Sequence, residues 1–252
     1  MFRYRYLNRL YSLFVVIALL LSSALTIRPV SANSIVVNSN ADVVDNDGMC
    51  TLREAIFSAN YDTAQFSSEG ECAPGSGADT ITFETDYVIT LMINQLPSIE
   101  SEITITGNGA ENTIIQASTC NPVEEDCGHT SRVFYVHPSG SLTLNSLMVR
   151  HGKTDGSGGA IYNAGTLHLM NSNLSNNKAV LSGGGIYNKS GSILTITESE
   201  ITNNFSSCDG GGIIVEEGHL TITGSTISGN TAMEAGGGIY NKASTLSIAY
   251  ST

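Results

Sequence analysis

Apolar and polar positions recur with a nearly fixed period in the C-terminal part of the chain. The phrase GGAIYN or a close variant occurs four times, and its first isoleucines are 25, 27 and 26 residues apart, at Ile161, Ile186, Ile213 and Ile239. An apolar pair follows each of them: Leu167 and Leu169, Leu194 and Ile196, Leu220 and Ile222, Leu246 and Ile248. A third apolar anchor comes later, at Leu174, Ile201 and Ile227. This near-constant spacing indicates one structural unit per repeat.

Each repeat holds three short alternating runs rich in Thr, Ile and Leu, separated by Gly, Asn and Ser. Runs of this length leave no room for a helix, so each repeat is predicted to be one coil of an all-β parallel solenoid. Coils stacked about 4.8 Å apart place equivalent residues above one another, and the Ile and Leu columns then fill a continuous core. The glycines are expected at tight corners. Because no Asp recurs at a fixed place after them, the pattern excludes a calcium-binding nonapeptide repeat.

The same strand pattern begins at Asp79, so residues 79–252 are predicted to form the solenoid. Its less regular first coils are expected at residues 80–83, 88–93, 103–105 and 114–115. Leu142 precedes Leu167 by 25 residues, a step that would place Val136 above Ile161. At the other end, the next inward position after Ile248 falls just past Thr252, so the chain is expected to stop inside a strand. Because this leaves a strand edge uncovered, we favour a fragment of a longer protein that has lost any anchor.

Two segments precede the solenoid. Residues 1–32 begin with three arginines, at positions 3, 5 and 9, before a short apolar run at 13–25, and they end with Val-Ser-Ala. This pattern is typical of a signal peptide cleaved after Ala32. The chain is therefore expected to be secreted or exposed at the cell surface or outer membrane. Cleavage would remove four of the 11 basic residues and none of the 23 acidic ones, leaving a net charge of −16. Such a charge disfavours nucleic acid and anionic membranes as partners.

Residues 33–78 are predicted to form a cap with one helix. Thr51 and Glu54 have the spacing of a capping box, and an apolar stripe follows at Leu52, Ala55, Ile56 and Ala59. Asn60 is expected to end the helix. The helix would cover the open end of the solenoid, where a terminal coil exposes core and strand edges.

All five cysteines lie in the part predicted to be exported, where disulfides form. Cys120 and Cys127 bracket an acidic loop, and Cys50 and Cys72 bracket the helix with its following loop, so each pair is expected to be bonded. Cys208 remains, either as a buried thiol or with a partner outside this chain. No histidine stacks near it in register, which disfavours a metal site.

At CTLREAIFSAN the chain resembles bacterial secreted proteins whose N-terminal domain is named for the signature Cys-Ser-Leu-Arg-Glu-Ala. An acidic stretch at Asp42 to Gly48, a second cysteine at Cys72 and the strand ADTITF complete the likeness. The glycine-rich coils are similar to those of polymorphic outer-membrane proteins and other right-handed parallel β-helix proteins. The resemblance implies an exported, surface-associated, right-handed β-helix and supplies no catalytic residues.

Calcium is the one cofactor that the sequence raises. Asp45, Asp47 and Glu54 fall at ligand positions of a twelve-residue calcium loop, but Val43 stands where its first ligand belongs. Glu54 also has a competing role in the capping box. An acidic turn without metal is therefore the favoured interpretation, and no cofactor is expected.

Two groups of charged residues are candidates for catalysis. Glu198 and Glu200 are expected on one strand about 6.6 Å apart, a spacing in the range of glycosidase carboxylates. No basic or aromatic residue shares their column to bind sugar, so a solvated face is preferred. Lys189, Glu216 and Lys242 are expected to stack as an ion-pair ladder, where a lysine is a poor base.

The residue after each marker isoleucine points outward by strand alternation: Tyr162, Tyr187, Ile214 and Tyr240. The tyrosines are predicted to form an exposed aromatic ladder, which either binds a cell-wall glycan or a surface protein or merely stabilises the coils. The preferred function is a non-catalytic binding, adhesion or display module without catalytic residues. The alternative is a carbohydrate-active β-helix enzyme, a polysaccharide lyase or glycoside hydrolase.

Overall fold

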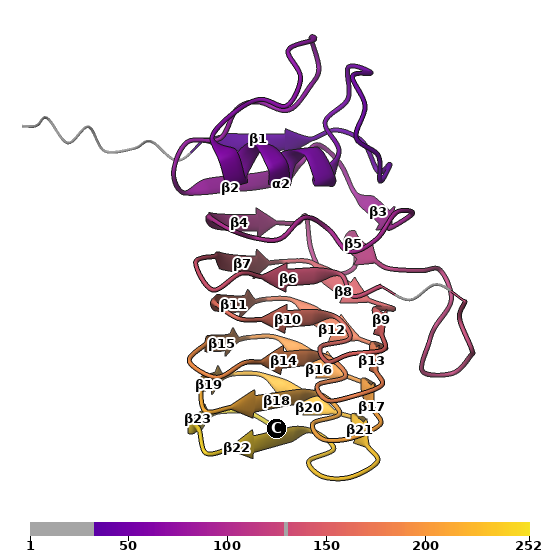
Figure 1. Ribbon diagram of the computed structural model, residues 1–252, viewed down its shortest axis with the longest axis vertical. Coiled ribbons are helices and arrows are strands. Elements are labelled where there is room, and N and C mark those ends of the chain that lie inside the picture. The colour runs from indigo at the N-terminus through magenta and orange to yellow at the C-terminus, as the bar shows by residue number, and fades with distance from the viewer. Residues whose placement is uncertain (1–32, 129–130) are drawn as a thin grey trace, which may run out of the picture. The chain divides into compact units, whose positions relative to one another are not determined.

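The computed structural model describes residues 33–128 and 131–252 of the 252-residue chain, and the predicted signal peptide lies outside them. The described residues fold as a parallel β-solenoid of about six turns with one short helix, α2 (Leu52–Tyr61). The coils follow one another in chain order, from β1 and α2 at one end to β22 and β23 at the other (Figure 1). The predicted solenoid is confirmed.

The described strands form four parallel sheets, named here A to D. Sheet A contains β1 (Ser34–Val37), β2 (Asp79–Phe83), β4 (Glu102–Thr106), β7 (Ser141–Asn145), β11 (Thr166–Met170), β15 (Ile193–Thr197), β19 (His219–Thr223) and β23 (Thr245–Ala249). Sheet B contains β3 (Tyr87–Thr90), β5 (Thr113–Gln116), β8 (Met148–Arg150), β12 (Asn173–Ser175), β16 (Glu200–Thr202) and β20 (Thr226–Ser228). Sheet C contains β6 (Phe134–Val136), β10 (Ile161–Asn163), β14 (Ile186–Asn188), β18 (Ile213–Glu216) and β22 (Ile239–Lys242). Sheet D contains β9 (Lys153–Thr154), β13 (Lys178–Ala179), β17 (Phe205–Ser206) and β21 (Thr231–Ala232).

One regular coil runs through sheets C, A, B and D in that order, as in β10, β11, β12 and β13. The sequence predicts the first three strands of each coil. It misses the fourth, because a two-residue strand carries no alternation. It also misses β1, which lies within the segment predicted as the cap and pairs with β2, so that sheet A begins before Asp79.

The predicted register is confirmed between neighbouring coils of the repeat region. Ile161 pairs with Ile186, Ile186 with Ile213 and Ile213 with Ile239. The placement of Val136 above Ile161 is wrong, because Ile161 pairs with Phe134 and Val136 with Asn163. Leu142 does pair with Leu167, as predicted. The turn from β6 to β7, His137 to Gly140, is two residues longer than the turn from β10 to β11 in the next coil, so the 25-residue step that relates Leu142 to Leu167 does not apply to β6.

The core consists of stacked aliphatic columns, bordered by buried ladders of polar residues. The marker isoleucines Ile161, Ile186 and Ile213 are fully buried. At a corner after sheet B, Asn177 and Asn204 are buried, and each side chain hydrogen-bonds to the next coil, at 2.9 Å to Asn204 and 2.9 Å to Asn230. A serine ladder lies between sheets A and B, where each hydroxyl after the first accepts from the backbone amide of the serine in the preceding coil: Ser172, Ser199, Ser225 and Ser251. These side chains satisfy peptide groups that the corners leave without a strand partner.

Helix α2 has the predicted capping box, with Thr51 and Glu54 each bonding to the other's backbone amide. Its apolar stripe is fully buried in the core and packs against β1, β2 and β4. The helix continues through Asn60 and ends at Tyr61, where Asp62 takes the left-handed conformation. Asn60 instead joins the helix to a coil, because its amide donates to Ser98 O at 2.7 Å and accepts from Glu100 N at 2.8 Å. It thereby satisfies peptide groups in the segment that extends sheet C by the bridge Ile99–Val136.

A buried ion pair links the helix to the first coil. Arg53 donates to both carboxylate oxygens of Asp42, at 2.7 and 3.0 Å. The guanidinium also donates to the carbonyl oxygens of Asn94 and Gln95, while Asp42 accepts from the amides of Met92 and Ile93. One ion pair therefore satisfies four peptide groups of the loop after β3.

Both predicted disulfides are present, Cys50–Cys72 and Cys120–Cys127. Cys208 is a free thiol and is half-buried. The first bridge ties the start of α2 to the segment that leads into β2. The second closes the loop between β5 and β6, which projects from the coils (Figure 1).

Candidate functional site

The predicted tyrosine ladder lies on the outer face of sheet C and is longer than the sequence indicated. Tyr135, Tyr162 and Tyr187 occupy equivalent positions in β6, β10 and β14. Their rings stack, with centroids 5.4 Å apart for the first pair and 4.7 Å for the second. Ile214 and Tyr240 continue the column. The sequence missed Tyr135 because the assumed position of Val136 moved β6 by two residues.

The ladder is less exposed than predicted. Tyr162, Tyr187 and Tyr240 are half-buried, and Ile214 is 2% exposed. The stacked rings of Tyr135, Tyr162 and Tyr187 cover one another's flat faces, since their centroid spacing matches the spacing of strands. The surface therefore offers ring edges and hydroxyl groups, not open ring faces for a sugar to stack on.

Charged groups accompany the ladder at two points. The Arg132 guanidinium carbon lies 5.1 Å from the centroid of the Tyr162 ring. The Tyr187 hydroxyl donates a hydrogen bond to the Glu216 carboxylate. Burial, and then this bond to a carboxylate, raise the pKa of Tyr187 above its usual value, and burial also raises the pKa of Tyr162. Both phenols are thus neutral at physiological pH and remain hydrogen-bond donors.

The predicted ladder of Lys189, Glu216 and Lys242 is only half formed. Lys242 Nζ lies 3.5 Å from Glu216 Oε1. Within residues 33–128 and 131–252, no ion pair joins Lys189 to Glu216. The Tyr187 hydroxyl bonds to Glu216 from the coil before, so the carboxylate lies between a tyrosine and a lysine.

Glu216→Lys is expected to lower the free energy of unfolding by roughly 1 to 2 kcal/mol. The change removes the acceptor of the Tyr187 hydroxyl and sets two lysines side by side in neighbouring strands. Thermal unfolding at low salt measures the effect. Glu234→Lys is the matched control, because Glu234 makes no side-chain hydrogen bond or ion pair within the described chain. Equal melting temperatures for the two variants would contradict the contact.

The calcium candidates lie close in sequence but are engaged otherwise. Glu54 accepts from the amides of Asp45 and Thr51, at 2.8 and 2.9 Å. Asp45 and Asp47 accept from the amides of Asn46 and Met49 in their own turn. The described residues contain no group of three or more His, Cys, Asp or Glu placed to hold a metal ion.

The carboxylate pair that was a candidate for hydrolysis does not share a strand. Glu200 lies in β16, but Glu198 precedes it in a turn with φ 47°, so the expectation of one strand is wrong. Ser146, Asn171 and Gly224 have the same left-handed conformation at this corner of other coils. A corner residue with that conformation interrupts strand alternation, and the 6.6 Å spacing does not apply.

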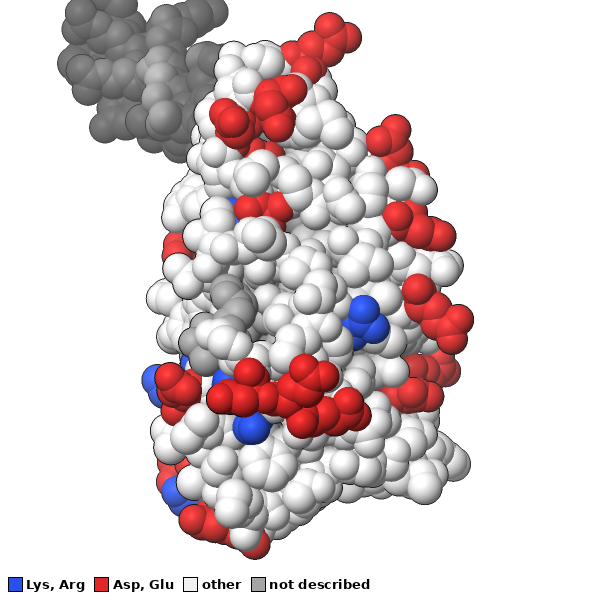
Figure 2. All heavy atoms as spheres, turned by 90° about the vertical axis from the view of Figure 1, so that its right-hand side faces the viewer, with Lys and Arg blue, Asp and Glu red and all other residues white. Residues whose placement is uncertain are grey.

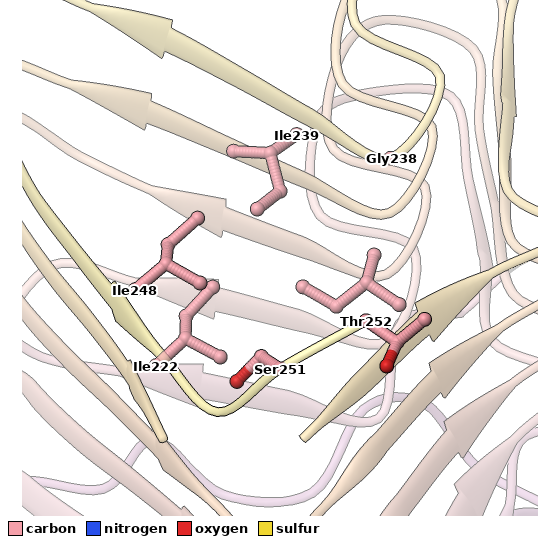
Figure 3. A pocket seen from close by; sticks show the side chains of 7 residues that line it. Ile222, Gly238, Ile239, Ile248, Ser251 and Thr252 are labelled. Carbon is pink, nitrogen blue, oxygen red and sulfur yellow. The ribbon is translucent and has the colours of Figure 1, made fainter. Parts of the chain in front are cut away.

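A hollow lies at the last coil, with a volume of about 350 Å³. Ile222, Ile227, Ile239 and Ile248 line it, and Ser251 and Thr252 form its rim (Figure 3). The first three belong to the same aliphatic columns that fill the core between earlier coils. The hollow is therefore a continuation of the core and contains no charged group that could orient a ligand.

No helix in the described part of the chain is long and apolar enough to cross a membrane. No curated protein and no solved structure matches the chain. A protein-family model does match at residues 224–242, which span the corner before β20 through β22. The model describes the Chlamydia polymorphic membrane protein repeat. The matched segment holds one copy of GGGIYN, and together with the solenoid it makes this chain similar to a polymorphic-membrane-protein type of β-helix.

Proposed function

We propose that this protein is a surface-associated, non-catalytic β-solenoid that binds another protein through the tyrosine ladder of sheet C. The observation that supports this most directly is the ladder itself. Three stacked tyrosines, with Arg132 over the second and Glu216 bonded to the third, form a continuous half-buried column across successive coils.

Two observations support a location outside the cytoplasm. Both disulfides lie within the solenoid and its helix region, and such bonds persist in oxidising compartments. The matching repeat belongs to a family described as membrane proteins. The signal peptide expected at residues 1–32 agrees with this placement.

A protein is the partner class that this surface fits better than a glycan. The ring faces are covered by their neighbours, so hydroxyls, ring edges and a guanidinium are what the ladder presents. Tyr and Arg are the residue types that dominate the energetics of protein interfaces. The acidic net charge of the chain disfavours polyanionic partners, and Asp and Glu also outnumber Lys and Arg on the side that carries the disulfide loop, which Figure 2 views.

The triple variant Tyr162→Ser, Tyr187→Ser, Tyr240→Ser is expected to attach to intact bacterial or mammalian cells at least about tenfold more weakly, because it removes several aromatic anchors. Labelled protein and flow cytometry measure the attachment. Trypsin treatment of the cells should abolish attachment of the native protein, and periodate oxidation of their glycans should not.

The matched control changes the outward column of sheet A instead, as His168→Ser, Thr195→Ser, Thr221→Ser. It should attach as the native protein does. Both triple variants are first shown to be folded by circular dichroism. If a folded ladder variant attaches as strongly as the native protein, the tyrosines only stabilise the coils. If periodate treatment but not trypsin treatment abolishes attachment of the native protein, the ladder binds a glycan.

A further inference from the structure

The loop between β5 and β6 covers a second hollow, which lies away from the ladder. This hollow has a volume of about 330 Å³, and Val123 and Glu124 of the loop line one side of it. The opposite side lies at the corner between sheets B and D. Its residues come from three successive later coils, those of β12 and β13, β16 and β17, and β20 and β21. The loop projects on the right-hand side of Figure 1, and Figure 2 views that side.

The hollow opens because, in the coil of β20 and β21, two stacked positions carry smaller residues than in the preceding coils. At the corner, Asn176 and Asn203 are followed by Gly229, and all three have left-handed φ of 55°, 55° and 65°. In sheet D, Lys178 and Phe205 are followed by Thr231. Lys178 lies 5.4 Å from the Phe205 ring centroid on the side of the preceding coil. Thr231 is too small to cover the ring from the following coil.

A disulfide and several hydrogen bonds hold the loop in place. The disulfide Cys120–Cys127 closes it, and the amides of Glu124 and Glu125 bond to Asn121 O inside it. Lys153 anchors its end, donating to Cys127 O at 2.6 Å and to Asp126 at 3.1 Å. A site whose walls are fixed before binding loses little entropy when a ligand enters.

Several polar groups of the hollow are free to bind a ligand, although the Asn204 side chain that also lines it is fully hydrogen-bonded. The side-chain amides of Asn176 and Asn203 make no hydrogen bond within the described chain, and Glu124 makes no ion pair there. The hollow thus combines two carboxamides, one carboxylate, a hydroxyl and part of an aromatic ring. Its volume is at the small end of ligand pockets.

We infer that this hollow binds a neutral sugar. Carboxamides and a carboxylate can hydrogen-bond to adjacent hydroxyl groups of a sugar, and the Phe205 ring can pack against the C–H face of a pyranose. No Lys or Arg lines the hollow and Glu124 does, which disfavours phosphate and other anions. A single carboxylate is a poor set of ligands for a cation.

The test uses the full chain and free sugars. Saturation-transfer NMR and calorimetry are run with glucose, galactose, mannose, N-acetylglucosamine and their β-linked disaccharides, with calcium chloride and sodium phosphate as rival probes. At least one sugar should bind. Gly229→Asn should raise its Kd at least about tenfold, because it restores the asparagine found at this corner in the two preceding coils and fills the hollow.

The matched control is Gly224→Asn, which restores an asparagine at the other left-handed corner, where Asn171 stands two coils earlier. It should leave Kd unchanged. Phe205→Thr provides a second variant that removes the ring without filling the space, and it should also raise Kd about tenfold. If no sugar binds, or if binding is unchanged in Gly229→Asn and Phe205→Thr, the inference is wrong.

Two further outcomes would also overturn it. Binding of calcium or phosphate alone that Gly229→Asn abolishes would assign the hollow to an ion. Sugar binding that the ladder variant abolishes and Gly229→Asn leaves intact would place the sugar on sheet C. That last outcome would also contradict the proposed protein contact of the ladder. The other outcomes leave that contact untouched, because Gly229→Asn and the ladder variant change different faces.

Discussion

Arg53→Met is expected to destabilise the protein by about 3 to 5 kcal/mol, the usual cost of removing one partner from a buried ion pair. Asp42 is 3% exposed, and the substitution would leave its carboxylate with backbone amides as its only partners. The carbonyl oxygens of Asn94 and Gln95 would lose their donors as well. Urea unfolding followed by circular dichroism measures the change in free energy.

Lys153→Met is the control for the loss of a paired cation. Its partner Asp126 is fully exposed, so water replaces the ion pair, and the loss is limited to the hydrogen bond from Lys153 to Cys127 O, about 1 kcal/mol. The double variant Asp42→Asn, Arg53→Met should recover part of the stability, because no uncompensated charge then remains buried. A loss for Arg53→Met no larger than that for Lys153→Met would show that the ion pair is not needed to order the first coil.

The stretch CTLREA can be explained residue by residue as structural. Cys50 forms a disulfide, Thr51 and Glu54 cap the helix, and Leu52 and Ala55 are fully buried. Arg53 pairs with Asp42. Every side chain of the stretch is thus engaged within the protein, and none is free to bind a substrate or metal. The functional surfaces must be sought on the coils.

The repeat region could be predicted closely because, in a parallel solenoid, residues one repeat apart in the sequence are neighbours in adjacent strands. Ile161, Ile186 and Ile213 stack as their spacing required. The prediction failed where a turn changed length, as between β6 and β7, because nothing in the apolar pattern marks two extra polar residues. That one error hid Tyr135 and shortened the ladder.

The polar features were harder to predict than the core. Asn177 and Asn204 resemble ordinary turn residues in the sequence, yet they are buried and bonded from coil to coil. The available signal was their regular spacing, 27 residues from Asn177 to Asn204 and 26 from Asn204 to Asn230. The hollow under the disulfide loop had a weaker signal, the change from Asn203 to Gly229, and the position of the loop above it depends on contacts distant in sequence.

Asn204→Leu is expected to cost about 4 kcal/mol, from four side-chain hydrogen bonds at roughly 1 kcal/mol each. Asn204 Oδ1 accepts from the amide and the side chain of Asn177, at 3.0 and 2.9 Å. Its Nδ2 donates to Leu174 O at 3.0 Å and to Asn230 at 2.9 Å. Leucine has a similar size but leaves these buried groups without partners.

Hydrogen exchange of the coil that contains β16 and β17, together with urea unfolding, measures the loss. In a solenoid each coil is stabilised mainly by its two neighbours, so increased exchange should spread from this coil to β12 and β20 on either side. Asn173→Leu is the control, because the half-buried Asn173 side chain makes only one bond, of 3.3 Å to Glu200, and its Oδ1 has no partner within the described chain. If Asn204→Leu unfolds at the same urea concentration as that control, the asparagine ladder contributes no more than any surface amide, and the aliphatic columns alone hold the coils together.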